Sequence, residues 1–212
     1  MLERLLIVDY DGTVTEDDVL DRVADHFAVH LEEKDGSETL DNSSLTLHDV
    51  IKREYAAVRA NRSDVIDWVL ANACIRKGFH KLVELANAEG WKLIVLSSGF
   101  YTLIDPVLSR EGLEDVCVIA NDVDPDPGGW RVRFLDESLC DICGEACKRR
   151  TLLGFEEARE VVYIGDGYSD RCAAETADLV FARSNLALHF ARKNIDFELF
   201  ETFDEIVDQL RC

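Results

Sequence analysis

Asp9 and Asp11 follow directly on residues 5–8, an apolar stretch whose branched side chains are typical of a buried strand. Because side chains alternate along an extended chain, two acids that lie two residues apart can face the same side. Gly12 allows the backbone to turn away at once, and Thr13 returns a hydroxyl toward the same point. Neighbouring carboxylates repel each other unless a cation or a shared proton compensates. A strand that ends in an ordinary Asp-Gly turn explains the same residues, so this stretch alone leaves both interpretations open.

Two further apolar strands end in polar residues. Residues 97–99, Ser-Ser-Gly, follow a predicted strand over residues 91–96, and they are expected to form a turn into the next helix. Such a turn directs backbone N–H groups and hydroxyls at whatever lies above the strand, which suits a phosphate group. The loop after a strand at residues 161–164 holds Asp166 and Asp170. Ligands of open parallel sheets bind outside the carboxyl ends of the strands, so the three strand ends are candidates for one site.

A cysteine-rich segment precedes this last strand. Cys140, Cys143 and Cys147 lie at spacings that invite a zinc site, and the first pair has a proper ligand spacing. No fourth ligand is evident, because Cys172 and His189 are distant in the sequence. The sequence therefore leaves open whether these cysteines bind a metal.

The elements that must position these residues divide into two kinds. Apolar residues recur with a helical period in three stretches before Gly78, and the polar segment from Glu32 to Ser44 is typical of a loop. Several short helices directly after a strand indicate a small helical insertion, because a crossover between parallel strands needs only one helix. From Gly78 onward strands alternate with helices, which are expected over residues 79–89, 171–177 and 203–210, and this alternation predicts an α/β fold. The three helical stretches are residues 19–27, 47–58 and 65–70.

Composition and charge exclude several classes of protein. The 212 residues are 47% hydrophobic, and their net charge is -20. This charge argues against nucleic acid or an anionic membrane surface as a partner, and it means that a phosphate site needs local positive charge. No apolar run is long enough to be a signal peptide or to span a bilayer, and seven scattered cysteines fit a reducing compartment. We expect a cytoplasmic protein, either a monomer or a homodimer.

In their order along the chain, the motifs resemble those of the haloacid dehalogenase superfamily of phosphatases. The resemblance covers nearly the whole chain. It implies the Rossmann-like parallel sheet of that superfamily over residues 1–14 and 79–212, with a small helical cap of the C1 type over residues 15–78. The position of the insertion resembles the subfamily, termed IB, that holds phosphoserine phosphatase. The matching residues are Asp9-Tyr10-Asp11-Gly12-Thr13, Ser97, Lys148, and Gly165-Asp166 with Asp170.

The resemblance implies a Mg²⁺-dependent phosphomonoesterase that acts on a small phosphorylated metabolite. Asp9 matches the nucleophile that forms an aspartyl-phosphate, and Asp11 matches the general acid and base. Mg²⁺ would be held by Asp9, the backbone carbonyl of Asp11, and Asp166, with Asp170 behind them. The residues expected to bind the phosphate are Thr13, Ser97, Ser98 and Lys148, and those expected to contact the rest of the substrate are Asp18 and Arg53.

Two branches of the subfamily are similar to this chain. Residues 75–79 and 177–183 resemble the corresponding stretches of the methionine-salvage phosphatase acting on 2-hydroxy-3-keto-5-methylthiopentenyl-1-phosphate. The phosphoethanolamine/phosphocholine phosphatase also carries a cysteine-rich stretch before its catalytic lysine. Ser169 falls where phosphoserine phosphatases carry an asparagine, which weakens phosphoserine as the substrate. A phosphotransferase or mutase that uses the same intermediate, and a non-catalytic Mg²⁺-binding protein like a phospho-receiver domain, remain as alternatives.

Overall fold

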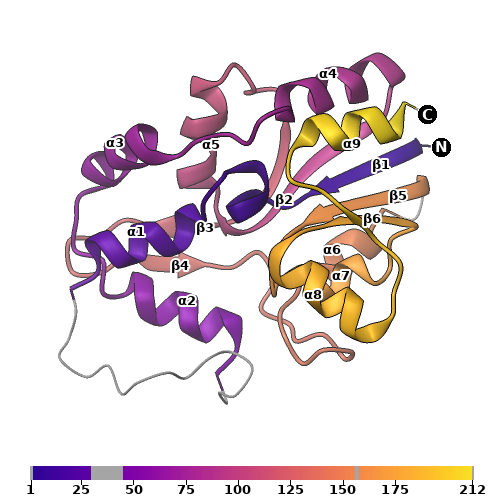
Figure 1. Ribbon diagram of the computed structural model, residues 1–212. Coiled ribbons are helices and arrows are strands. Elements are labelled where there is room, and N and C mark those ends of the chain that lie inside the picture. The colour runs from indigo at the N-terminus through magenta and orange to yellow at the C-terminus, as the bar shows by residue number, and fades with distance from the viewer. Residues whose placement is uncertain (1, 30–44, 156–157, 212) are drawn as a thin grey trace.

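The computed structural model describes residues 2–29, 45–155 and 158–211 (Figure 1). The loop predicted from Glu32 to Ser44 lies outside the described residues. The described chain forms a seven-stranded sheet in the order β4-β3-β2-β1-β5-β6-β7. All neighbouring strands are parallel except β3 and β4, which form an antiparallel hairpin. The strands are β1 (Leu2–Val8), β2 (Lys92–Phe100), β3 (Cys117–Asp124), β4 (Arg131–Arg133), β5 (Ala158–Gly165), β6 (Leu179–Ala182) and β7 (Glu198–Leu199).

Helices cover both faces of the sheet, as Figure 1 shows. Alternate residues of β1 point to opposite faces, so that Leu6 and Val8 join one apolar core and Leu5 and Ile7 join the other. All four side chains are fully buried, which explains why β1 is a continuous apolar run. The first face is covered by α4 (Phe79–Glu89), α5 (Tyr101–Arg110) and α9 (Phe203–Leu210), and the second by α6 (Arg149–Leu153), α7 (Arg171–Ala174) and α8 (Ser184–Lys193).

The helices predicted between the first two strands are present as α1 (Val19–Phe27), α2 (Leu47–Tyr55) and α3 (Arg62–Asn72). They share a third apolar core with α5 and the β3–β4 hairpin. The Tyr55 hydroxyl donates to the Leu20 carbonyl at 2.9 Å and thereby joins α2 to α1. Trp130 of the hairpin donates its ring N–H to the Ala60 carbonyl at 2.9 Å. This packing places α1 and α2 beside the carboxyl end of the sheet. The division of the chain into a core domain and a cap domain stays a prediction.

The structure corrects the prediction of a turn at residues 97–99. These residues belong to β2, which continues to Phe100, and the pairing with β3 shifts register between Ser97 and Phe100. The shift is a bulge whose backbone groups are bonded by side chains: the Gly99 N–H donates to the Ser97 hydroxyl at 2.8 Å, and Asn121 donates to the Ser98 carbonyl at 2.8 Å. Local sequence does not reveal these partners, because Asn121 comes from the neighbouring strand.

Among the described residues, no helix combines the length and the apolar character that crossing a membrane requires.

Candidate active site

The carboxyl ends of three adjacent strands form the candidate active site. β1 lies between β2 and β5 in the sheet: strands β2 to β4 are added on one side of β1, and strands β5 to β7 on the other. Such a switch point is where ligands bind in open parallel sheets. Asp9 follows β1, Ser97 lies near the end of β2, and Asp166 follows β5. The structure therefore brings together residues that are up to 157 positions apart, as the sequence predicts.

The turn after β1, η1 (Tyr10–Val14), depends on Gly12. Gly12 has a φ of 73°, a conformation that side chains with a Cβ rarely adopt. A Cβ at this position would also lie 2.6 Å from the Asp166 carboxylate. Thr13, which is fully buried, donates its hydroxyl to the same carboxylate at 3.2 Å. Gly12 thus permits the close approach of the β1 and β5 loops, and Thr13 holds Asp166 by its hydrogen bond. The role of Thr13 in binding phosphate stays a prediction.

Lys148 connects the acids of the site. Its ammonium group donates to Asp9 Oδ1 and, at 2.7 Å, to Asp170 Oδ1. Lys148 and Asp9 are each only 5% exposed, and Asp170 is fully buried, so these charges are shielded from water. Burial by itself lowers the pKa of Lys148, but the carboxylates of Asp170 and Asp9 outweigh burial and raise this pKa above the usual lysine value. Lys148 is therefore a permanent cation at the centre of the acidic cluster.

The acids outnumber this one lysine. Burial, followed by the charge of Asp170, raises the pKa of Asp9 well above the usual range, and Lys148 only partly opposes the rise. Burial and Asp170 likewise raise the pKa of Asp166. Carboxylate oxygens of Asp9, Asp166 and Asp170 lie within 4.8 Å of one another. Such a cluster of hard oxygen donors with excess negative charge fits Mg²⁺.

Asp170 has a supporting position within this cluster. Its Oδ1 accepts from Lys148 and, at 2.8 Å, from the Tyr163 hydroxyl. Its Oδ2 accepts from the backbone N–H groups of Asp166 and Gly167 at 3.1 and 2.9 Å. With both oxygens engaged by four donors, Asp170 orients the β5 loop and Lys148. Its place behind the direct metal ligands stays a prediction.

Asp11 is held by the beginning of α1. Its Oδ1 accepts from the N–H groups of Val19 and Leu20 at 3.0 and 3.1 Å, and its Oδ2 faces the Ser97 hydroxyl at 3.4 Å. Burial raises the pKa of Asp11 to about 6, against the opposing effects of the Leu20 N–H and of Lys148. A carboxyl group with this pKa can both donate and accept a proton near neutral pH.

A pocket of about 340 Å³ opens above these groups, between the carboxyl end of the sheet and helices α1 and α2. Asp18 and Ser98, both predicted site residues, line it. Arg53 is exposed on α2, whereas its neighbour Glu54 lines the pocket. The structure thus brings Asp18 to the site and leaves Arg53 outside the pocket wall. The lining residues are Asp9, Asp11, Asp18, Leu20, Asp21, Leu47, Val50, Ile51, Glu54, Ser98, Gly99, Asp166, Gly167, Tyr168, Ser169 and Asn185.

Three residues that support the site have no role assigned to them from the sequence. Arg76 is only 8% exposed, and its guanidinium donates to the carbonyls of Gly12, Thr13 and two further residues of the same loop at 2.9–3.0 Å. Arg183 donates to the Gly12 carbonyl at 3.2 Å, and Tyr163 donates to Asp170. Two signals could have found the arginines: both lie in the stretches that resemble the methionine-salvage phosphatase, residues 75–79 and 177–183, and a chain with 43 acids has few cations to bury.

Comparison with known proteins agrees with this geometry. Residues 6–175 match the family of haloacid dehalogenase-like hydrolases. The chain is 28% identical to the 2-hydroxy-3-keto-5-methylthiopentenyl-1-phosphate phosphatase of Brevibacillus brevis, over 96% of this chain and 93% of that protein. It is 25% identical to Pdp3-interacting factor 1 of Schizosaccharomyces pombe, over 96% and 94% of the two chains.

Solved structures give the same fold. A phosphoserine phosphatase solved as a phospho-aspartyl intermediate analogue superposes with a TM-score of 0.74, covers 99% of both chains and is 17% identical. The phosphoserine phosphatase of T. onnurineus superposes with a TM-score of 0.69 over 98% of this chain and 94% of that one, at 19% identity. The family match spans both the strand ends that carry the site and most of the sheet that positions them. The chain therefore belongs to the haloacid dehalogenase-like hydrolases.

Proposed function

We propose that this hydrolase is a Mg²⁺-dependent phosphomonoesterase that works through an aspartyl-phosphate on Asp9. The observation that carries the proposal is the buried pair of Asp9 and Lys148 at the switch point, beside a cluster of acids that a divalent cation would balance. A hydrolysis of this kind needs a nucleophile in line with the leaving group, neutralisation of the phosphoryl charge and a proton for the leaving oxygen. The described site offers a residue for each need.

Asp9 and Asp11 each act in both half-reactions, formation and hydrolysis of the aspartyl-phosphate. Lys148 occupies Oδ1 of Asp9, so Oδ2 is the oxygen that attacks phosphorus while the bond from phosphorus to the leaving oxygen breaks. The Asp11 carboxyl donates its proton to that oxygen, and the product alcohol leaves. Asp11, now a carboxylate, accepts a proton from the water that attacks the aspartyl-phosphate, which releases phosphate and restores Asp9.

The metal and the phosphate ligands complete the arrangement. Bound Mg²⁺ supplies charge neutralisation for the transferring phosphoryl group, and Asp9, the backbone carbonyl of Asp11, and Asp166 would hold it. Lys148 also neutralises the charge of the phosphoryl oxygens, and Ser97 and the Ser98 backbone N–H orient these oxygens. Asp170 and Thr13 keep Lys148 and Asp166 in place through their hydrogen bonds to these two residues.

The charge of the pocket limits the class of substrate that can bind. Helices α1 and α2 contribute Asp21 and Glu54 to its wall, Asp18 caps the start of α1 there, and none of the described residues that line this pocket is basic. A substrate that carries a second anionic group, such as the carboxylate of phosphoserine, would meet repulsion there. We therefore infer a phosphomonoester whose remaining part is neutral or cationic. The enol phosphate named for the Brevibacillus relative and phosphoethanolamine both meet this condition.

The experiment that tests the proposal is phosphate release across a panel of phosphomonoesters, with Mg²⁺ present and then chelated. The panel contains the methionine-salvage enol phosphate, phosphoethanolamine, phosphocholine, a sugar phosphate and phosphoserine. We expect metal-dependent release that favours the neutral or cationic substrates over phosphoserine. Consumption of substrate with transfer to a sugar in place of release would indicate a phosphotransferase. Binding of phosphate analogues with no turnover of any substrate would indicate a receiver-like protein.

A further inference from the structure

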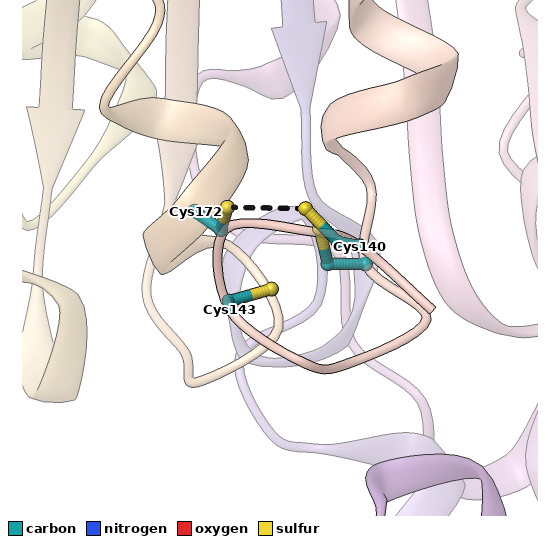
Figure 2. A group of neighbouring side chains, drawn as sticks. Cys140, Cys143 and Cys172 are labelled. Carbon is teal, nitrogen blue, oxygen red and sulfur yellow. Dashed lines mark hydrogen bonds between the residues drawn. The ribbon is translucent and has the colours of Figure 1, made fainter. Parts of the chain in front are cut away.

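The structure supplies a fourth partner for the cysteine-rich segment. Cys172 lies at the second position of α7, and the fold brings its sulfur to those of Cys140, Cys143 and Cys147. All four sulfur atoms lie within 4.8 Å of one another. Figure 2 shows the sulfurs of Cys140, Cys143 and Cys172 turned toward a common centre, with the first two on the loop and the third on the helix. The sequence could not show this, because 24 residues and strand β5 separate Cys172 from Cys147.

The spacing of the sulfurs agrees with one bound ion. In a tetrahedral zinc site with Zn–S bonds of about 2.3 Å, neighbouring sulfurs are about 3.8 Å apart. The sulfurs of Cys140 and Cys172 are 3.9 Å apart, which is much longer than the roughly 2.05 Å of a disulfide. Four thiols in this arrangement form a closed set of soft ligands, which is the donor set of a structural zinc site rather than a catalytic one.

The loop that carries three of the cysteines is shaped around this centre. The Gly144 N–H donates to the Cys140 carbonyl, and the Cys140 N–H donates to the Glu145 carbonyl, both at 2.8 Å. Gly144 has a φ of 74°, which allows the chain to reverse between Cys143 and Cys147. These bonds fix the turn that carries Cys140 and Cys143, so their sulfurs are held in place toward Cys172.

We propose that Cys140, Cys143, Cys147 and Cys172 bind one structural Zn²⁺ ion that fastens the loop before α6 to helix α7. The positions of the four ligands in the chain indicate what the ion would stabilise. Cys147 immediately precedes Lys148, and Cys172 comes two residues after Asp170, so the ion cross-links the two segments whose side chains form the buried Lys148–Asp170 pair. The metal thereby positions the lysine of the proposed active site. This last step, unlike the zinc site itself, depends on the proposed function.

The test is the metal content of the full-length protein, purified under reducing conditions and dialysed. We expect about one zinc ion per chain in the wild type. Cys172→Ser and Cys143→Ser should lose the zinc, because each removes one of four thiolates. Cys74→Ser is the matched control: Cys74 is exposed and lies outside the cluster, so this variant should keep the zinc. Asp166→Asn should also keep it, which separates the cysteine site from the acidic one.

Cobalt provides a second measurement on the unaltered chain. Co²⁺ added to zinc-stripped, reduced wild-type protein should produce the visible bands of tetrahedral cobalt together with a sulfur-to-metal charge-transfer band, and added Zn²⁺ should remove them. Because this measurement needs no substitution, it does not depend on whether the serine variants fold. Zinc-free wild-type protein without these bands, iron in place of zinc, or an intact mass that shows a disulfide between Cys140 and Cys172 would overturn the proposal.

Activity separates this proposal from the proposed function. If both hold, Cys172→Ser should retain its secondary structure but lose phosphatase activity in parallel with its zinc, while Cys74→Ser keeps both. Zinc binding without phosphatase activity in the wild type would leave the metal site standing and contradict the proposed function. Phosphatase activity in a wild-type protein that binds no zinc would contradict the zinc site alone.

Discussion

Asp11 shows how a single residue can serve both the chemistry and the fold. The sequence predicts its proximity to Asp9, since two residues on an extended chain share a face. The sequence does not predict that the Asp11 carboxylate accepts the N–H groups of Val19 and Leu20, because this contact requires the path of the chain from η1 to α1. The contact fixes the carboxyl group beside the pocket and connects the proposed proton donor to α1, which contributes to the pocket wall.

Replacement of Asp11 by asparagine should affect substrates according to their leaving group. An alkyl phosphate leaves as an alkoxide and needs a proton, so we expect its release rate to fall by about 10²–10⁴-fold in Asp11→Asn. An aryl phosphate such as p-nitrophenyl phosphate leaves as a stable phenolate, so formation of its phospho-enzyme should fall far less. The measurement is the initial burst of nitrophenolate compared with steady phosphate release from an alkyl phosphate. Equal losses for both substrates would exclude Asp11 as the general acid.

Lys148 is a second single residue on which the site depends, because its side chain holds two buried carboxylates together. In Lys148→Met, Asp9 and Asp170 lose their buried cation, which we expect to lower the free energy of unfolding by about 3–5 kcal/mol near neutral pH. The loss should shrink toward pH 5, since protonation removes the uncompensated negative charge. Urea unfolding at several pH values measures this loss. Arg150→Met is the matched control, because Arg150 lies two residues after Lys148 and its side chain is 63% exposed. Equal stability of Lys148→Met and the control would contradict the buried pair.

The loop η1 is the element on which the site depends, and Arg76 is its main support. Arg76 comes from the segment between α3 and α4 and satisfies the carbonyls of Gly12, Thr13, Thr15 and Glu16. Hydrogen bonds within the loop engage the carbonyls of Asp9, Tyr10 and Asp17. Arg76 supplies donors for buried carbonyls that these bonds leave over. The buried cation of Arg76 therefore supports the acidic cluster through the backbone of the loop that carries it.

We expect Arg76→Ala to cost about 3 kcal/mol of unfolding free energy, because buried carbonyl groups lose their donors. Proposed phosphatase activity should fall as well, since Asp9 directly precedes the loop and Asp11 belongs to it. Arg131→Ala, which truncates an exposed arginine of β4, is the control and should leave both unchanged. Urea unfolding and phosphate release measure the two effects. An Arg76→Ala variant as stable as the control would show that the loop supports itself.

The elements also show what the sequence can and cannot predict. The bounds of α4 and α9 are predicted to the residue, because apolar periodicity and, for α4, the left-handed Gly90 mark them. The helix predicted over residues 171–177 is shorter, ending at Ala174, and the two-residue strand β7 is too short to leave a pattern. The bulge at residues 97–99 and the fourth cysteine depend on contacts between distant segments, which local patterns do not contain. The grouping of the acids can be predicted because they follow strand ends, whereas Lys148 is identified only through the order of motifs that resembles the family.

At the scale of the whole molecule, the net charge of -20 is the dominant feature. Self-repulsion of this size destabilises a compact state, and salt screens it. The Debye length falls from about 30 Å at 0.01 M to about 8 Å at 0.15 M ionic strength, so repulsion across the molecule should be largely removed over this range. The acidic wall of the pocket adds to the same field, which a substrate phosphate must enter against repulsion.

Thermal stability should therefore rise with salt. A gain of about 1 kcal/mol would correspond to a rise in Tm of about 2–4 °C for a chain of this size. The measurement is the Tm in NaCl and in KCl between 0.01 and 0.15 M, where the two salts should act alike if screening is the cause. A Tm that stays level or falls would mean that the acidic groups are already compensated within the folded chain.

The central claim is that Asp9 carries the phosphoryl group during turnover. The most direct measurement is mass spectrometry of peptides from enzyme quenched in acid while it hydrolyses its substrate with Mg²⁺ present. The account predicts a phosphoryl group on the peptide that contains Asp9. In Asp9→Asn this modification should be absent and phosphate release should fall by at least about 10³-fold. Full phosphate release by Asp9→Asn, or a phosphoryl group on another residue during normal turnover, would contradict the account.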